Sequence, residues 1–302
     1  MGKIAFVFAG QGAQAPGMGL AFCNESPAAK AVFEAADAVR EGTSAQCFES
    51  SEAELQITKN TQPCLYTVEM AIAAAVAESG IKADVTAGFS LGELSALTYA
   101  KVVSLENGLK MVKSRGELMQ IAAEKHDTSM AAVLKLSTED VVRICSQYNH
   151  VYPVNFNCPG QISVSGDAQE MLAFADAVKD AGGRAKFLKV NGAFHSPYMS
   201  EAARGFAEVI ASIPFSEPDI PVYSNYTGTV YPEDMKKILA AQIHNPVKWE
   251  TIIGNMITEG VDTFIELGPG KTLCGLIKRI SSDVRLFNIA VPEDLIKLKA
   301  EL

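Results

Sequence analysis

The chain has 302 residues, of which 48% are hydrophobic and 20% are charged, and its formal net charge at pH 7 is −9. This composition is typical of a globular protein and excludes disordered and fibrous chains. The acidic balance argues against nucleic-acid binding, which depends on neutralising phosphates, so we expect no nucleic-acid partner.

The first part of the chain, up to residue 126, predicts strands and helices in alternation. Lys3–Phe8 is a short apolar run typical of a buried strand. The glycines after it leave no signal-peptide pattern, so we expect a cytoplasmic protein. A second strand is expected over 85–87, and the apolar run from Met70 to Ala77 is too short to cross a membrane. Helices are expected over 27–40, 60–78, 93–100 and 105–123.

The pattern changes near His126, where shorter strands and helices begin. We expect strands over 130–136, 151–157, 161–166 and 185–190, and helices over 139–147 and 168–181. The order strand, helix, strand, strand, helix, strand is typical of a ferredoxin-like βαββαβ unit. We therefore predict a small ferredoxin-like domain at 127–192, inserted into a larger α/β domain made of 1–126 and 193–302.

The last part of the chain returns to the pattern of the larger domain. Strands are expected over 221–225, 263–266 and 284–289, and helices over 200–213, 249–259 and 272–280. Short strands that alternate with helices favour a parallel sheet.

Two glycine-rich segments imitate nucleotide-binding loops. Gly10-x-Gly12-x-x-Ala15 follows a strand, but a helix stands where the dinucleotide fingerprint needs a second strand ending in an acidic residue. Gly270-Lys-Thr272 ends like a phosphate loop, but Ile265 occupies the position of its first glycine. The six cysteines show no metal-ligand spacing either. We therefore expect no cofactor and no metal.

A GxSxG motif, Gly88-Phe-Ser90-Leu-Gly92, stands between a predicted strand and a predicted helix. In α/β-hydrolase-like folds this context holds a nucleophilic serine on a tight turn, and small residues two positions away prevent clashes. The motif therefore favours Ser90 as a nucleophile, the backbone N–H of Leu91 as an oxyanion donor, and an α/β-hydrolase-like larger domain.

A nucleophilic serine needs a base, and the chain has four histidines. His126 and His150 lie in polar segments, and His244 follows a helix and precedes Asn-Pro, so these three are interpreted as structural. His195 lies in a loop after a predicted strand, which is where α/β enzymes place catalytic groups. Its position alone leaves a catalytic and a structural role equally open.

At this point the sequence resembles the malonyl-CoA:acyl carrier protein transacylases and the related acyltransferase domains of polyketide and fatty acid synthases. The matching segments extend along the whole chain, and their joint order is more specific than any one of them. They are residues 8–14 (FAGQGAQ), 60–63 (NTQP), 88–93 (GFSLGE), 114–116 (SRG), 155–161 (NFNCPGQ), 192–196 (GAFHS), 242–249 (QIHNPVKW) and 266–270 (ELGPG).

The resemblance implies a role for each of five residues. Ser90 would be the nucleophile and His195 its general base, and the backbone carbonyl of Gln242 would orient that histidine. The backbone N–H groups of Gln11 and Leu91 would bind the oxyanion. The implied activity is malonyl transfer from malonyl-CoA to the acyl carrier protein through a malonyl-serine ester, for fatty acid or polyketide synthesis.

Substrate selection is also implied by the resemblance. Arg115 would pair with the malonyl carboxylate, although its place on a helix alone favours a solvated arginine. Phe194 would crowd out a methylmalonyl group. Phe89 stands where the family usually has histidine, which leaves the acyl preference and the rate open. Three residues of the family's cleft are assigned a lesser role, namely Asn155, Asn157 and Gln161.

Two other functions remain open from the sequence: a serine hydrolase with the same elbow, and a non-catalytic module that docks carrier protein. A hydrolase would release malonate, whereas a transacylase moves it to a thiol. We expect a monomer. Because carrier proteins are acidic, docking needs a local basic patch, for which the candidates are Lys186, Lys189, Lys271, Lys278 and Arg279.

Overall fold

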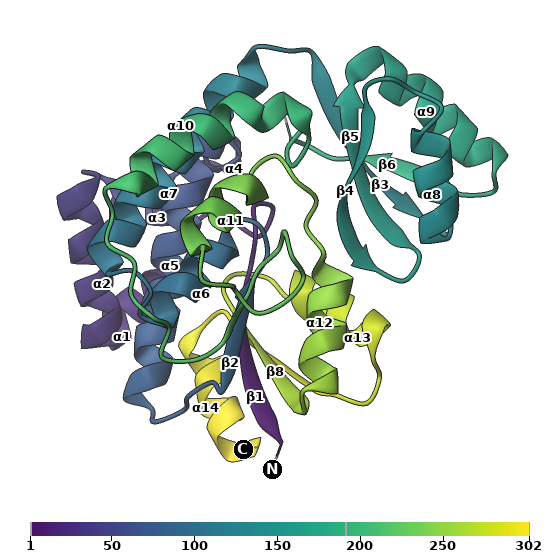
Figure 1. The fold of residues 1–302 in the computed structure, drawn as a ribbon. Helices are drawn as coiled ribbons and strands as arrows, with labels where there is room; N and C mark the ends of the chain where they lie inside the picture. Colours follow the sequence, from purple (N-terminus) through teal and green to yellow (C-terminus); the bar gives the residue numbers. More distant parts are fainter. Residues whose placement is uncertain (1, 191, 302) are drawn as a thin grey trace.

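The computed structural model describes residues 2–190 and 192–301, in which two separate sheets are each covered by helices (Figure 1). The larger sheet has five strands in the order β7-β2-β1-β8-β9, and all neighbouring strands run parallel. The expected α/β class with a parallel sheet is therefore confirmed. The strands are β1 (Lys3–Phe8), β2 (Val85–Gly88), β7 (Val222–Tyr223), β8 (Val261–Leu267) and β9 (Arg285–Ile289).

The central strand β1 contributes to two hydrophobic cores, because successive side chains of a strand point to opposite faces. Phe6 and Phe8 belong to one core, and Ala5 and Val7 to the other. The first core is formed with α2 (Pro27–Val39), α5 (Thr58–Glu78), α6 (Gly92–Tyr99), α7 (Leu105–Glu124) and α10 (Ser200–Ala211). The second is formed with α12 (Trp249–Thr258) and α13 (Thr272–Ile280).

The smaller sheet is antiparallel, with the strand order β4-β5-β3-β6. Its elements follow the expected order strand, helix, strand, strand, helix, strand. Val133, Ile144 and Phe174 belong to a third core between the sheet and its helices. The elements are β3 (Thr128–Leu134), α8 (Thr138–Cys145), β4 (Val151–Cys158), β5 (Gln161–Asp167), α9 (Ala168–Asp180) and β6 (Arg184–Phe187).

Three strands end at least two residues before their predicted ends. β3 ends at Leu134 instead of residue 136, because Lys135 has a φ of 69°, which extended backbone does not allow. β6 pairs with β3 alone and ends at Phe187 instead of residue 190. β7 has two residues, because the chain turns at Ser224, whose N–H donates to the Thr229 carbonyl.

Several helices were not predicted. Three of them have four to seven residues, which is too short for a helical hydrophobic period to be recognised. No helix in residues 2–190 and 192–301 is both long enough and apolar enough to cross a membrane. The helices without a predicted range are α1 (Leu20–Glu25), α3 (Thr43–Glu49), α4 (Glu52–Leu55), α11 (Met235–Gln242) and α14 (Pro292–Glu301).

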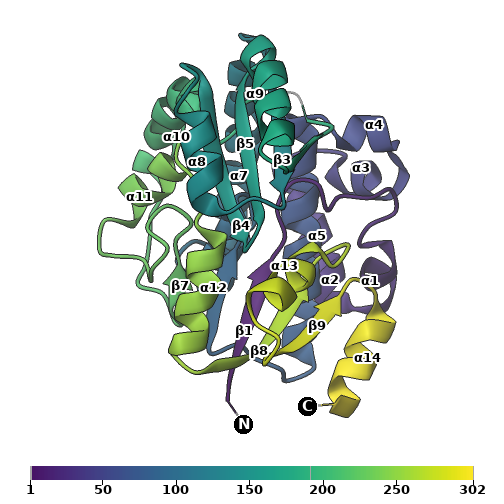
Figure 2. The same ribbon diagram turned by 90° about the vertical axis from the view of Figure 1, so that its right-hand side faces the viewer.

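The smaller sheet meets the larger part of the chain near the carboxyl ends of β1 and β2 (Figure 2). Val247 joins them: its N–H donates to the Val154 carbonyl over 2.9 Å, and its carbonyl accepts from the Phe156 N–H over 2.9 Å. The chain returns from β6 to α10 through the loop that contains His195. Functional groups of parallel α/β sheets gather at this end of the strands.

Candidate active site

The turn between β2 and α6 holds Ser90 in a strained backbone conformation. Its φ of 54° lies in the left-handed region, which residues other than glycine rarely adopt. A Cβ on Gly88 would lie 1.8 Å from the carbonyl carbon of Gly92, and a Cβ on Gly92 would lie 2.2 Å from the carbonyl oxygen of Phe8. The turn therefore requires glycine on both sides of Ser90, at the spacing of the GxSxG motif.

Asn225, which the sequence analysis missed, anchors this turn. Its Oδ1 accepts the Ser90 N–H over 2.6 Å, and its Nδ2 donates to the Gly88 carbonyl over 2.6 Å. Asn225 is fully buried and follows the short strand β7. No motif marks it, because the contact joins positions far apart in the chain.

His195 lies next to Ser90 and bonds at both ring nitrogens. Its Nε2 is 2.7 Å from the Ser90 Oγ, and its Nδ1 is 2.9 Å from the backbone carbonyl of Gln242. A carbonyl can only accept, so Nδ1 carries the proton and Nε2 is free to accept the serine proton. The predicted pair of Ser90 and His195, with Gln242 behind it, is therefore assembled in space.

Burial keeps the His195 ring neutral. The side chain is 4% exposed, and burial, assisted by the positive charge of Arg115, lowers its pKa to about 4. The Gln242 carbonyl partly opposes this shift, because it stabilises the protonated ring. At neutral pH the imidazole can therefore act as a base.

Arg115 points into the protein from α7 and is 1% exposed, so the interpretation of a solvated arginine from its helix position alone was wrong. Its hydrogen bonds go to neutral oxygens: Oε1 of Gln62 over 2.8 Å, Oε1 of Gln242 over 2.8 Å, and Oγ of Ser90 over 3.2 Å. Burial lowers its pKa to about 10, which still leaves it charged at neutral pH. A buried cation thus lies beside the nucleophile.

A small cavity of 80 Å³ opens at this point, and the predicted Phe194 lies in its wall. Gln11 and Leu91 also line it, and neither backbone N–H has an acceptor among the described residues. Two free donors beside Ser90 form a potential oxyanion site. Among the residues that line the cavity are Gln11, Ser90, Leu91, Arg115, Phe194 and His195.

A second cavity of 220 Å³ is lined by the three residues to which the resemblance gave a lesser role. Asn155 lines both cavities, whereas Asn157 and Gln161 line the second one without lining the first. The buried Oδ1 atoms of Asn155 and Asn157 have no hydrogen-bond partner in the described residues. The Oε1 of Gln161 accepts from Arg279 over 2.6 Å.

Two further residues of the site lay inside motifs quoted from the sequence, but their roles were not recognised. Gln62 accepts from Arg115, and Glu93 accepts from the side chain of Gln242 over 3.0 Å. Glu93 is fully buried, and burial raises its pKa to about 7. Both interactions join residues more than fifty positions apart, so sequence spacing could not reveal them.

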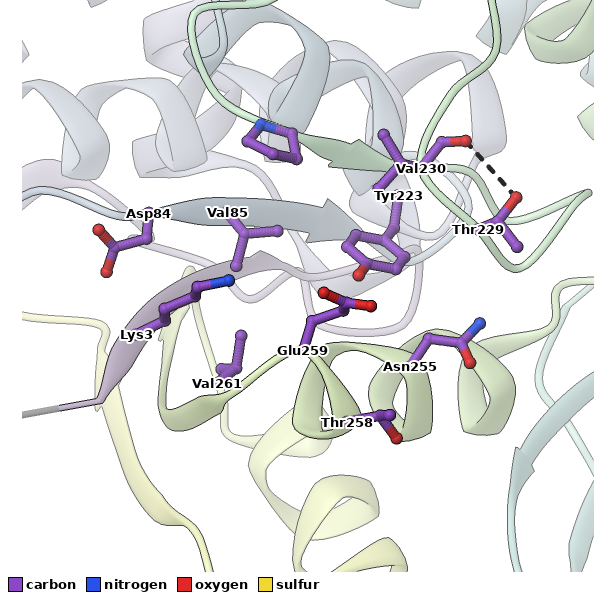
Figure 3. Close-up of a pocket in the computed structure, with 11 residues that line it drawn as sticks. Lys3, Asp84, Val85, Tyr223, Thr229, Val230, Asn255, Thr258, Glu259 and Val261 are labelled. Carbon is purple, nitrogen blue, oxygen red and sulfur yellow. Dashed lines mark hydrogen bonds between the residues drawn. The ribbon is translucent and has the colours of Figure 1, made fainter.

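A larger cavity of 800 Å³ lies at the other end of the parallel sheet (Figure 3). It is lined by Lys3, Val85 and Val261, which begin β1, β2 and β8. None of the predicted site residues lines it. Within residues 2–190 and 192–301, no group of three or more His, Cys, Asp or Glu side chains could hold a metal.

Comparison with known proteins identifies close relatives along the whole chain. The family model described as acyl transferase domain matches residues 5–285. A malonyl CoA-acyl carrier protein transacylase of Bacillus subtilis is 40% identical, covering 98% of this chain and 96% of that protein. The protein of the same name from Synechocystis is 36% identical, covering 97% and 99%.

Solved structures agree with this similarity. A malonyl CoA-acyl carrier protein transacylase from Clostridium perfringens superposes with a TM-score of 0.95 at 36% identity, covering 99% of this chain and 96% of that one. A malonyl-transacylase solved in complex with a type II PKS acyl-carrier protein has a TM-score of 0.96 at 33% identity, covering 99% and 100%.

Proposed function

Because the chain belongs to the acyl transferase family, and within it to the malonyl-CoA:acyl carrier protein transacylases, we propose that it transfers malonyl groups through a malonyl ester on Ser90. The donor is malonyl-CoA, and the acceptor is the phosphopantetheine thiol of an acyl carrier protein. One observation carries the choice of acyl group: the guanidinium of buried Arg115 lies 3.2 Å from the Ser90 Oγ and has neutral partners. A dicarboxylic acyl group on Ser90 would supply an anion in direct contact with this guanidinium.

The first half-reaction loads the serine. The Nε2 of His195 takes the Ser90 hydroxyl proton while Oγ attacks the thioester carbonyl, and the Gln11 and Leu91 N–H groups bind the resulting oxyanion. The C–S bond then breaks, and coenzyme A leaves as a thiol with the proton from His195. The carbonyl of Gln242 stabilises the protonated ring, which is the task of a carboxylate in other triads.

The second half-reaction repeats these steps with a different thiol. The carrier thiol gives its proton to His195 and attacks the ester, and Ser90 leaves with that proton as a hydroxyl. We assign the second cavity, which shares Gln11 and Asn155 with the first, to the phosphopantetheine arm. Phe194 in the acyl cavity supports the exclusion of a methyl-branched malonyl group, a selection worth about 1–3 kcal/mol.

The architecture supports a finer description of the fold. The all-parallel sheet with a serine elbow after β2 supports an α/β-hydrolase-like domain of residues 1–126 and 193–302. The antiparallel order β4-β5-β3-β6 supports a ferredoxin-like domain of residues 127–192. All groups in the scheme come from one chain, so a monomer suffices. The five basic residues named above stay the predicted docking surface for the carrier.

Intact-protein mass spectrometry after brief mixing with malonyl-CoA tests this function. We expect one malonyl adduct on the wild-type chain, none on Ser90→Ala, and an unchanged adduct on Ser146→Ala, whose serine is exposed on the smaller part. Added carrier protein should then remove the adduct and carry it. Rapid release of free malonate without a carrier adduct would indicate a hydrolase, and a chain with neither adduct nor turnover would leave the binding-module interpretation.

A further inference from the structure

The side chain of Gln242 connects the main groups of the site. Its backbone carbonyl accepts from His195, and its Nε2 donates to the Ser90 carbonyl over 2.7 Å and to the Glu93 Oε2 over 3.0 Å. Its Oε1 accepts from Arg115 over 2.8 Å. The family resemblance gave Gln242 a backbone role, whereas in this structure its amide also links a carboxylate to a guanidinium.

Glu93 fixes which way this amide faces. The Glu93 carboxylate accepts three hydrogen bonds: from the hydroxyl of Tyr231, from the Asn225 N–H over 3.2 Å, and from the Gln242 Nε2. An ionised carboxylate only accepts, and a guanidinium only donates. The amide therefore has to turn its nitrogen to Glu93 and its oxygen to Arg115, because the reversed amide would face donor with donor and acceptor with acceptor.

In the same arrangement the negative charge of Glu93 offsets the positive charge of Arg115 without occupying its guanidinium. Glu93 and Arg115 are both buried, and the electrostatic attraction between them stabilises the ionised form of each. The Gln242 amide stands between them, so the pair is bridged instead of direct. A direct carboxylate partner would occupy the guanidinium fork, which a substrate carboxylate needs for two parallel hydrogen bonds.

We propose that Glu93 is a positioning residue for malonyl transfer, holding Arg115 through the Gln242 side chain so that its guanidinium stays available to the malonyl carboxylate. This role rests on the proposed function. Tyr231 completes the unit, because its hydroxyl can donate to the carboxylate and can also accept from the protonated acid. Glu93 touches no reacting atom in this scheme.

Two variants of Glu93 distinguish the effect of its hydrogen bonds from the effect of its charge. Glu93→Gln removes the charge but can keep the contacts, because its amide oxygen can accept from Gln242 and Asn225 in place of Oε2 while its nitrogen donates to the Tyr231 hydroxyl. Glu93→Asp keeps the charge but shortens the reach. We expect Glu93→Asp to lower kcat/KM for malonyl-CoA by about 100-fold, because a guanidinium displaced by about 1 Å orients its substrate poorly. Glu93→Gln should keep most of this activity, because the hydrogen-bonded bridge to Arg115 stays in place. Acetyl-CoA has no carboxylate for Arg115, so its kcat/KM should fall much less.

Glu69→Asp is the matched control. Glu69 is another fully buried glutamate, and it accepts from Ser95 on α6 over 2.5 Å, away from Gln242. This variant should keep the wild-type ratio of malonyl to acetyl transfer even if its melting temperature falls. Equal losses on both donors in Glu93→Asp, or a Glu93→Asp enzyme with wild-type selectivity, would overturn the positioning role.

Gln242→Met keeps the test decisive if the Glu93 variants do not fold. It retains the backbone carbonyl for His195 but removes all three contacts of the amide, to Glu93, Arg115 and the Ser90 carbonyl. The same loss of malonyl preference is therefore expected. A Gln242→Met enzyme with wild-type preference would refute the bridge. Failure of the proposed function is distinguishable, because the wild-type chain itself would then form no malonyl adduct on Ser90.

Discussion

Arg115 is the residue to which the proposed function assigns the choice of acyl group. It is buried, and its hydrogen-bond partners within the described residues are neutral oxygens. A buried charge is costly unless it is paired, and a site that holds a charge open in this way favours a ligand of opposite sign. In the proposed function this ligand is the free carboxylate of a malonyl group on Ser90.

Replacing Arg115 by alanine should therefore change selectivity more than catalysis. We expect kcat/KM for malonyl-CoA to fall about 100-fold, the loss of a charge-assisted pair worth about 3 kcal/mol. Acetyl-CoA should become the relatively better donor. Arg115→Lys keeps the charge but loses the planar fork, so it should recover only part of the malonyl activity. Steady-state kinetics with both donors measures this, and an unchanged malonyl preference would remove Arg115 from its role.

At the residue scale, sequence reasoning found the groups with motifs and missed those defined by distant contacts. Ser90 and His195 were singled out from a turn motif and a loop position, and the structure brings them within 2.7 Å. Asn225 had no signal, because an asparagine after a short strand is ordinary turn chemistry. Arg115 needed the family resemblance, because helical spacing shows that a residue borders a face but not that its charge turns inward.

The elbow between β2 and α6 shows how elements position these residues. Phe8 and Gly88 are partners in neighbouring parallel strands, so the loop after β1 and the elbow after β2 emerge side by side. The backbones approach closely enough to exclude a Cβ at Gly92, which would lie 2.2 Å from the Phe8 carbonyl oxygen. The elbow is therefore a property of two strands and a helix packed together.

Gly88→Ala should damage this unit as a whole. The new Cβ would lie 1.8 Å from the Gly92 backbone, and backbone atoms cannot rotate away as a side chain can. We expect a loss of about 3 kcal/mol of stability or more, with loss of Ser90 acylation. Gly254→Ala in α12 is the control, because nothing lies within 4 Å of its added Cβ. That variant should be neutral or more stable by about 1 kcal/mol. Thermal unfolding and malonyl adduct formation measure both, and a Gly88→Ala protein as stable as wild type would contradict the packing argument.

Elements were predicted well where a long apolar period or a capping residue marked them. Pro27–Val39 begins after a serine that caps it, and Thr272–Ile280 was predicted to the residue. The errors occur where tertiary contacts decide. The two-residue β7 exists because it pairs with β2, and α4 has only four residues. Four residues leave no readable helical pattern for α4, whereas β7 was predicted over 221–225 and is shorter than that because only two residues pair.

At the scale of the molecule, the candidate site needs both parts of the chain. Ser90 and Arg115 come from the larger part, whereas Met130 and Asn155 of the same cavity come from the strands of the smaller sheet. His195 lies on the loop through which the chain returns from the smaller sheet to the larger part. The order of elements along the chain could be predicted, but this convergence could not, because no local pattern encodes how two sheets dock.

The buried groups at this junction couple the stability of the molecule to pH in opposite senses. The pKa of His195 is lowered from 6.5 to about 4, so the unfolded chain binds more protons and stability rises as pH rises from 4 to 6.5. The pKa of Glu93 is raised from 4.5 to about 7, so the folded chain binds more protons and stability falls as pH rises from 4.5 to 7. Each contribution is about 3 kcal/mol, so the two nearly cancel where the windows overlap.

Removing the Glu93 carboxyl should therefore reveal the pH dependence of stability that His195 contributes. In Glu93→Gln the opposing contribution is gone, and we expect the free energy of unfolding relative to wild type to increase by up to about 3 kcal/mol as pH rises from 4.5 to 7. Urea unfolding at a series of pH values measures this difference. Ser146→Ala, which changes an exposed hydroxyl, should run parallel to wild type at every pH. A Glu93→Gln curve that also ran parallel to wild type would mean that the Glu93 carboxyl titrates alike in the folded and unfolded chains, and would contradict the burial effect argued here.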